Sequence, residues 1–134
     1  AVLRETAVLY PEARIFVAGK SLGARIAAMT ATAESRRMRI EGAIFIGYPL
    51  HPPGYPGEGG GAAVVACPLR MLFLQGTRDA FANAAIMKKF VKRLSRATLH
   101  EIAGGDHSLR TSADRSTVVD EAATVIAAWI DRQT

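Results

Sequence analysis

The stretch Ile15-Phe16-Val17-Ala18-Gly19-Lys20-Ser21-Leu22-Gly23 decides the fold class. Its apolar beginning, 15–18, is typical of a buried strand, and a segment of helical spacing begins at Leu22. Between them lies the pattern Gly-x-Ser-x-Gly, in which a tight turn from strand to helix exposes a serine hydroxyl above a sheet. The stretch therefore predicts a strand–turn–helix unit with Ser21 as a candidate nucleophile.

The rest of the chain repeats this alternation of short apolar runs and longer amphipathic segments. We expect strands at 15–18, 43–46, 69–74 and 98–102. We expect helices at 22–33, 83–95 and 117–132, and the end of another helix at 2–9. The segment 98–102 alternates apolar and polar residues, which is typical of an edge strand. The pattern predicts an α/β fold with a parallel sheet flanked by helices.

Two local signals refine this prediction. The segment 51–61 holds three prolines and five glycines, and we expect a loop without regular structure there. The pair Thr117 and Asp120 has the spacing of a capping box, which would open the last helix. Neither a repeat nor a second compositional block divides the chain, so we expect one domain over residues 1–134.

A serine nucleophile needs a base and an acid. Asp79 follows the apolar run 69–74, and His107 follows the last predicted strand in a glycine-containing turn. Ser21, Asp79 and His107 would thus each lie beyond the carboxyl end of a different parallel strand, at the sheet edge where sites form. Asp79 would orient His107, and His107 would take the proton from Ser21. His100, inside a predicted strand, is expected to be structural.

Alternatives exist for each member of this set. Ser21 could serve only as a helix N-cap, Asp79 only as a turn residue and His107 only as a surface histidine. Asp106 is a rival acid, but its position next to His107 would direct its side chain elsewhere.

A phosphate-binding loop and a metal site are excluded by spacing. Arg14 stands where a phosphate-binding loop needs its first glycine, and no pair of metal-binding residue types has ligand spacing within one element. We therefore expect neither a metal nor a cofactor.

The turn itself provides further site elements. Gly19, Lys20 and Gly23 would form the nucleophile elbow, with glycines leaving room for the turn and the crossing of strand and helix. The backbone N–H of Leu22, at the start of the helix, would be one donor of an oxyanion hole.

Composition bears on partners and location. The 134 residues are 49% hydrophobic and 22% charged, with a net charge of +5. The basic residues of the helix 83–95 lie opposite its apolar stripe and do not alternate with aromatic residues, so they indicate a solvated face and no nucleic-acid partner. No apolar run is long enough to cross a bilayer, and we expect no membrane association. The single Cys67 favours a reducing cytoplasm.

Four stretches resemble the dienelactone-hydrolase-like group of α/β-hydrolases, and within it the branch of the testis-expressed hydrolase-like protein and a regulatory subunit of the NSL chromatin complex. They are Gly19-Lys20-Ser21-Leu22-Gly23-Ala24-Arg25, Gly47-Tyr48-Pro49-Leu50-His51-Pro52-Pro53-Gly54, Gln75-Gly76-Thr77-Arg78-Asp79 and Gly104-Gly105-Asp106-His107-Ser108. The resemblance implies an α/β-hydrolase fold with a triad of Ser21, Asp79 and His107. Dienelactone hydrolases carry a cysteine nucleophile where this chain has Ser21, so their substrate is not implied.

The family fold begins with several strands and a loop that donates a second oxyanion-hole N–H. Here a short helix directly precedes the strand 15–18, and we expect a C-terminal portion of the fold whose N-terminal strands are absent. An exposed edge at 15–18 and one missing donor would favour self-association through that edge, or weak activity of the chain alone.

The predicted function is a serine hydrolase that cleaves an ester or related acyl bond of a small molecule. Lys20 and Arg78, beside the nucleophile and the acid, would favour an acidic substrate. The alternatives are a non-catalytic α/β-hydrolase-like module that binds a protein, and a basic nucleic-acid-binding domain.

Overall fold

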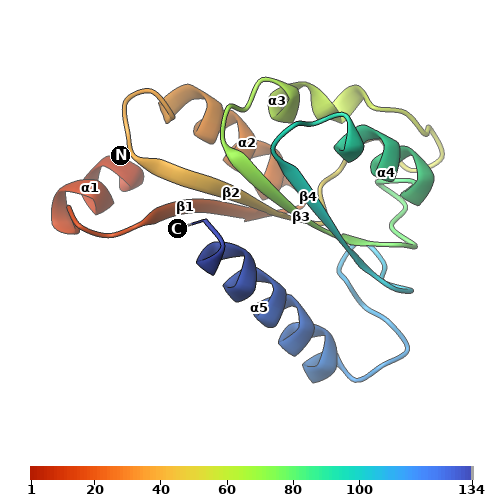
Figure 1. Ribbon diagram of the computed structural model, residues 1–134. Helices are drawn as coiled ribbons and strands as arrows, with labels where there is room; N and C mark the ends of the chain where they lie inside the picture. Colours follow the sequence, from red (N-terminus) through yellow and green to blue (C-terminus); the bar gives the residue numbers. More distant parts are fainter. Residues whose placement is uncertain (134) are drawn as a thin grey trace.

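The computed structural model describes residues 1–133, which form a four-stranded sheet and its flanking helices (Figure 1). The strands are β1 (Ile15–Lys20), β2 (Ile40–Ile46), β3 (Arg70–Gly76) and β4 (Ala97–Ile102). The helices are α1 (Val2–Leu9), α2 (Leu22–Glu34), α3 (Ala62–Val65), α4 (Ala84–Lys92) and α5 (Arg115–Asp131), with a short 3-10 helix η1 (Gly59–Gly61) before α3.

The sheet is entirely parallel and its strands lie in chain order, β1-β2-β3-β4. This confirms the predicted α/β class. β4 is an edge strand, as its alternating pattern predicts. Within residues 1–133, β1 pairs only with β2 and forms the opposite edge.

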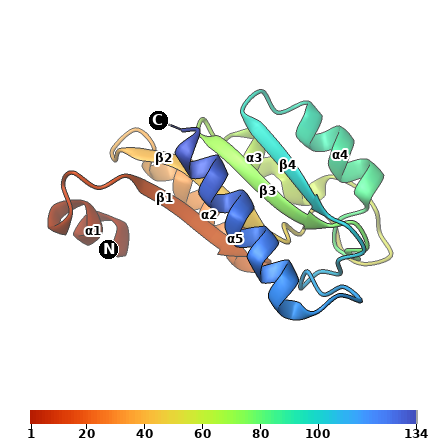
Figure 2. The ribbon, with the colours of Figure 1, turned by 60° about the horizontal axis from the view of Figure 1, so that its bottom comes forward.

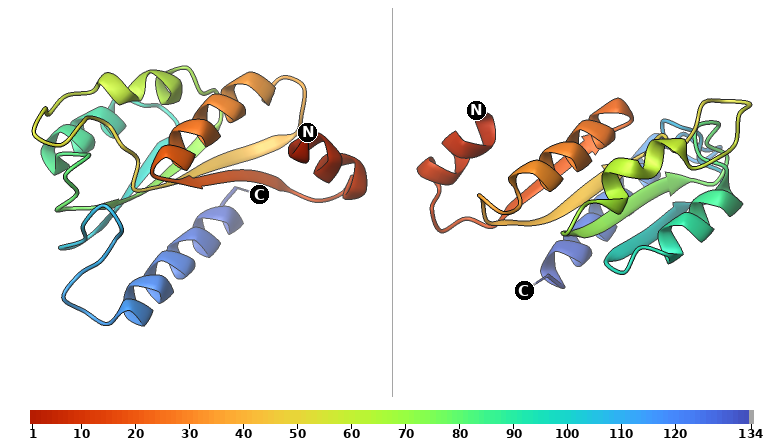
Figure 3. Two further views of the ribbon diagram at one scale, coloured as in Figure 1. Left: turned by 180° about the vertical axis from the view of Figure 1, so that it is seen from behind. Right: turned by 90° about the horizontal axis from the view of Figure 1, so that it is seen from above.

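Helices cover both faces of the sheet. α2, α3 and α4 lie over one face, and α5 runs diagonally across the other (Figures 1 and 2). The views from behind and from above place α1 at the edge of the molecule, beyond the amino end of β1 (Figure 3). There Leu3 and Ala7 pack against the core of the α2 face. None of the helices within residues 1–133 is long and apolar enough to span a membrane.

Alternation along the central strands builds one core on each face. Phe45 of β2 and Phe73 of β3 pack toward α2, α3 and α4. Their neighbours Ile44 and Leu72 point the other way and contact Trp129 of α5. Because each strand buries both of its faces, the central strands appear in the sequence as continuous apolar runs.

The structure corrects three local predictions. β1 continues two residues beyond the predicted 15–18, because Gly19 and Lys20 still pair with the end of β2. The region 51–61 is not wholly irregular, since its last three residues form η1, which leads directly into α3. α5 begins at Arg115 with Asp114 at its N-cap, so Thr117 lies inside the helix and opens no capping box.

Candidate active site

Ser21 occupies a strained turn between β1 and α2. Its backbone has φ 54 and ψ −122, a conformation that L residues rarely adopt and that is typical of a nucleophile elbow. The Ser21 N–H donates to the Ile46 carbonyl at 2.9 Å, which holds the turn against the end of β2. Although Ser21 stands at the N-cap position of α2, its side chain makes no capping hydrogen bond. The hydroxyl is therefore available for another partner.

The two elbow glycines differ in necessity. A Cβ atom on Gly19 would overlap the Gly23 carbonyl, so only glycine permits β1 and α2 to approach this closely. A Cβ atom on Gly23 would meet nothing. Packing thus requires the first glycine, whereas it does not require the second.

His107 joins Ser21 to Asp79. The Ser21 Oγ lies 2.7 Å from Nε2 of His107, and Nδ1 of the same ring lies 2.9 Å from Oδ2 of Asp79. Since a carboxylate only accepts, Nδ1 carries the proton and Nε2 is left to accept from the Ser21 hydroxyl. The ring of Phe81 packs on the imidazole with a centroid separation of 4.4 Å. The three residues that the sequence singled out are thus brought together in one hydrogen-bonded chain.

The loop after β4 is shaped to present His107. Gly47, at the end of β2, has φ +59, and a Cβ atom there would lie 2.8 Å from the His107 carbonyl oxygen. Asp106 accepts hydrogen bonds from the backbone N–H groups of Ser108 and Arg110 and from the Arg110 guanidinium. These bonds, led by the one from the Arg110 backbone, hold the pKa of Asp106 below its ordinary value. Both carboxylate oxygens of Asp106 are thus engaged within the turn. The carboxylate that bonds the His107 ring is that of Asp79, as the sequence predicts.

Asp79 is a buried carboxylate with several donors. Its side chain is fully shielded from solvent. Besides His107, it accepts from the Phe81 N–H at 2.7 Å and from Nε2 of Gln75 at 2.6 Å. A buried charge is costly unless hydrogen bonds compensate it, and these donors supply that compensation.

Gln75 connects Asp79 to a neighbouring strand end, a role that the motifs in the sequence do not predict. While its Nε2 donates to Asp79, its Oε1 accepts the Tyr48 N–H at 3.0 Å. Gln75 is 2% exposed, and it is a polar residue at the end of the strongest apolar run. That contrast is the only signal in the sequence that could have identified it.

The other two histidines lie outside this chain of bonds. His100 of β4 bonds Glu121 of α5 at 2.8 Å, in agreement with a structural role. His51 is buried; its Nδ1 bonds the Pro52 carbonyl and its Nε2 accepts the Asn83 N–H. Both ring nitrogens of His51 are thus engaged in holding the loop after β2.

A cavity of about 450 Å³ opens beside the nucleophile on the α2 face. Ser21, Leu22 and Arg25 line one wall, and the segment 49–53 lines the other. Tyr48 supports this wall by donating its hydroxyl to the Gly60 carbonyl at 2.6 Å. Burial raises the pKa of the Tyr48 phenol, although the charge of Arg25 opposes the shift.

Leu22, whose N–H is the predicted oxyanion donor, lines the same cavity at the start of α2. As the first residue of the helix, Leu22 has no carbonyl partner for its N–H inside the helix. Among residues 1–133, no group of three or more His, Cys, Asp or Glu side chains is arranged to hold a metal ion.

Comparison with known proteins agrees with this architecture. The model of the "Alpha/beta hydrolase domain" family matches residues 2–131. The esterase domain of a Rhodothermus marinus protein superposes with a TM-score of 0.74 at 17% identity, over 98% of this chain and 66% of that one. An alpha-beta serine hydrolase homologue from Coxiella burnetii superposes with a TM-score of 0.61 at 25% identity, over 79% of this chain and 47% of that one.

A monoacylglycerol lipase from Paleococcus ferrophilus superposes with a TM-score of 0.65 at 14% identity, over 99% of this chain and 74% of that one. The chain thus spans 66% and 47% of the first two structures, so its matches cover part of a longer fold. None of the curated proteins matches the chain. The family match over residues 2–131 establishes that the chain belongs to the alpha/beta hydrolase domain family.

Proposed function

We propose that the protein is a serine hydrolase that cleaves an ester or related acyl bond with Ser21 as nucleophile, His107 as base and Asp79 as acid. The observation that carries the proposal is the unbroken chain of hydrogen bonds from the Ser21 Oγ through His107 to the buried Asp79 carboxylate. A serine hydroxyl is activated near neutral pH when it is hydrogen-bonded to a base that a third group orients.

The first half of the reaction transfers the acyl group to the enzyme. The Ser21 Oγ attacks the substrate carbonyl carbon while Nε2 of His107 takes the hydroxyl proton. The developing negative charge on the carbonyl oxygen lies near the amino end of α2, where the Leu22 N–H donates to it. His107 then returns the proton to the alcohol oxygen as the bond between that oxygen and the carbonyl carbon breaks.

The second half repeats these steps with water. His107 takes a proton from a water molecule while the water oxygen attacks the acyl carbon. It then returns a proton to Ser21 Oγ as the carboxylic acid product leaves. Throughout, Asp79 keeps the Nδ1 proton in place and stabilises the transient imidazolium. The substrate in this proposal is a small acyl compound.

Labelling with a fluorophosphonate, followed by intact-mass measurement, tests the proposal. We expect one adduct, which disappears in Ser21→Ala and in His107→Ala because removing a triad member costs several orders of magnitude in rate. Ser95→Ala and His100→Ala are matched controls, since both residues lie outside the hydrogen-bonded chain, and both variants should label like the wild type. A folded wild-type protein that forms no adduct would refute the proposal and favour a protein-binding module.

A further inference from the structure

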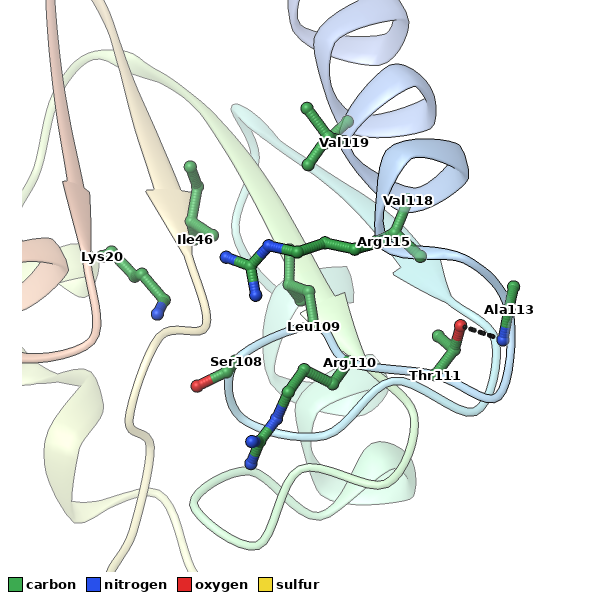
Figure 4. Close-up of a pocket in the computed structure, with 11 residues that line it drawn as sticks. Lys20, Ile46, Ser108, Leu109, Arg110, Thr111, Ala113, Arg115, Val118 and Val119 are labelled. Carbon is green, nitrogen blue, oxygen red and sulfur yellow. Dashed lines mark hydrogen bonds between the residues drawn. The ribbon is translucent and has the colours of Figure 1, made fainter.

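A second hollow lies beside α5, next to the residues that adjoin Ser21 and His107 in the chain. It has a volume of about 390 Å³ and lies between the ends of β1 and β2, the loop after β4 and the first turns of α5 (Figure 4). Its lining includes Lys20, directly before the nucleophile, and Ser108, directly after the base. Volumes of this size are typical of small-molecule sites. Ser21 and His107 do not line the hollow themselves, but the residues that adjoin them in the chain do, so the hollow borders the site.

The hollow combines an apolar floor with a cationic rim. The floor is built by Ile46, Leu109, Val118, Val119 and Ala122. The rim carries three cations and no carboxylate: Lys20, Arg110 and Arg115. Such a surface matches a ligand that has both an alkyl segment and a negative charge.

Two of the three cations have no carboxylate partner. Arg110 pairs with Asp106 at 2.9 Å, whereas Lys20 and Arg115 form no ion pair within residues 1–133. Their side chains extend toward the space between β1 and α5 from opposite sides (Figure 4). The nearby Asp114 carboxylate accepts from the Ser116 hydroxyl.

The placement of Arg115 adds to the positive potential. Arg115 is the first residue of α5, and the amino end of a helix already carries partial positive charge. A cation at that position is unfavourable for the helix by itself. A bound anion would be attracted by the helix end, by the Arg115 guanidinium and by the Lys20 ammonium together.

We infer that this hollow binds the carboxylate of an acidic ester, with Lys20 and Arg115 as the specificity-determining residues. The inference rests on the proposed function and names its substrate class. The alkyl segment between the carboxylate and the scissile ester lies on the apolar floor, while the ester carbonyl lies at Ser21. One carboxylate between a guanidinium and an ammonium matches the two free cations. Arg78, the other cation considered from the sequence, lines neither the hollow nor the cavity beside α2.

Paired substrates test the selectivity. The p-nitrophenyl monoester of adipate carries a carboxylate where the p-nitrophenyl ester of adipamic acid carries a neutral amide. We expect a higher kcat/KM for the acid, and a fall of about tenfold in the acid-to-amide ratio in the double variant Lys20→Met/Arg115→Met. The double variant Arg36→Met/Lys89→Met removes two exposed cations elsewhere and should keep the ratio. Equal kcat/KM values for the two esters would overturn the inference.

A binding measurement on Ser21→Ala separates this inference from the proposed function. Monomethyl adipate, added to the ¹⁵N-labelled variant, should shift the amide signals of Ser108 and Leu109, and binding should weaken with added salt. Dimethyl adipate, which is neutral, should bind more weakly. Selective binding without hydrolysis by the wild type would refute the proposed function alone, whereas equal binding of both esters would refute the inference alone.

Discussion

Replacing Gln75 with leucine tests whether this buried amide holds Asp79, the proposed catalytic acid, in place. Leucine has a similar volume, so the change removes two hydrogen bonds without opening a large cavity. The Tyr48 N–H loses its acceptor at 3.0 Å, and the Asp79 carboxylate loses a donor at 2.6 Å. A buried donor left unpaired costs about 1–3 kcal/mol, and a hydrogen bond to a charged group contributes about 1.5–3 kcal/mol. We expect the free energy of unfolding to fall by about 3 kcal/mol.

The effect on reactivity follows from the freedom that Asp79 gains. Asp79 keeps the Phe81 N–H and His107 as donors, so the triad survives but its geometry loosens. Since small displacements of catalytic groups cost one to two orders of magnitude, the rate of fluorophosphonate labelling should fall at least about tenfold. Urea unfolding measures the stability, and intact mass against time measures the rate.

A glutamate at position 75 tests whether this side chain lies against the Asp79 carboxylate. In Gln75→Glu the new carboxyl faces Asp79, and this repulsion raises the pKa of the new carboxyl. The folded state then binds that proton more tightly than the unfolded state does. The stability of Gln75→Glu should therefore fall, relative to wild type, as the pH rises above about 4.3.

The control is Gln133→Leu, the same change near the end of α5, which should alter stability by less than about 0.5 kcal/mol. If Gln75→Leu unfolds at the wild-type urea concentration and labels at the wild-type rate, Gln75 does not position the acid.

Three other changes test separate parts of the site. Arg110 holds the pKa of Asp106 below its ordinary value. The stabilisation by Asp106 should therefore be present above about pH 4 and be lost on further acidification. In urea unfolding, the stabilities of the wild type and of Asp106→Asn should converge at low pH. Phe81→Leu removes the ring that packs on His107 and should slow fluorophosphonate labelling about tenfold. The free energy of unfolding, measured in urea, should fall by about 1 kcal/mol. An unchanged labelling rate would exclude an orienting role for Phe81. Gly19→Ala should destabilise the fold by about 3 kcal/mol, since its Cβ would overlap the first turn of α2, whereas a wild-type Tm would contradict the tight crossing.

The sequence predicts the sheet and the convergence of Ser21, Asp79 and His107 because each depends on a local pattern. A parallel sheet buries both faces of its strands, which produces apolar runs that propensity alone detects. Ser21, Asp79 and His107 follow three such runs, and parallel strands bring their carboxyl ends to one edge. Their convergence therefore required no knowledge of the side-chain geometry.

What the sequence does not predict depends on contacts between distant segments. Gln75 acquires its role only because β2 and β3 are neighbours in register, so that the Tyr48 N–H meets the amide. The helical turns at 59–65 begin within a glycine-rich segment that favours irregular structure by itself, and burial of Val64 stabilises them. The cationic hollow likewise needs α5 to cross the sheet beside Lys20, which no spacing along the chain indicates.

The Asp79 carboxylate and the wall of the cavity beside α2 are connected by hydrogen bonds. The Phe81 N–H donates to Asp79, and the Phe81 carbonyl accepts the N–H groups of Leu50 and His51 from the cavity wall. The ring of His51 in turn accepts the Asn83 N–H from the start of α4. Phe81 thus connects the cavity wall to the Asp79 carboxylate, so we expect a substrate that displaces the wall to disturb Asp79 as well. Because the hollow beside α5 shares none of these bonds, its selectivity for charge can change by substitution while the acid stays in place.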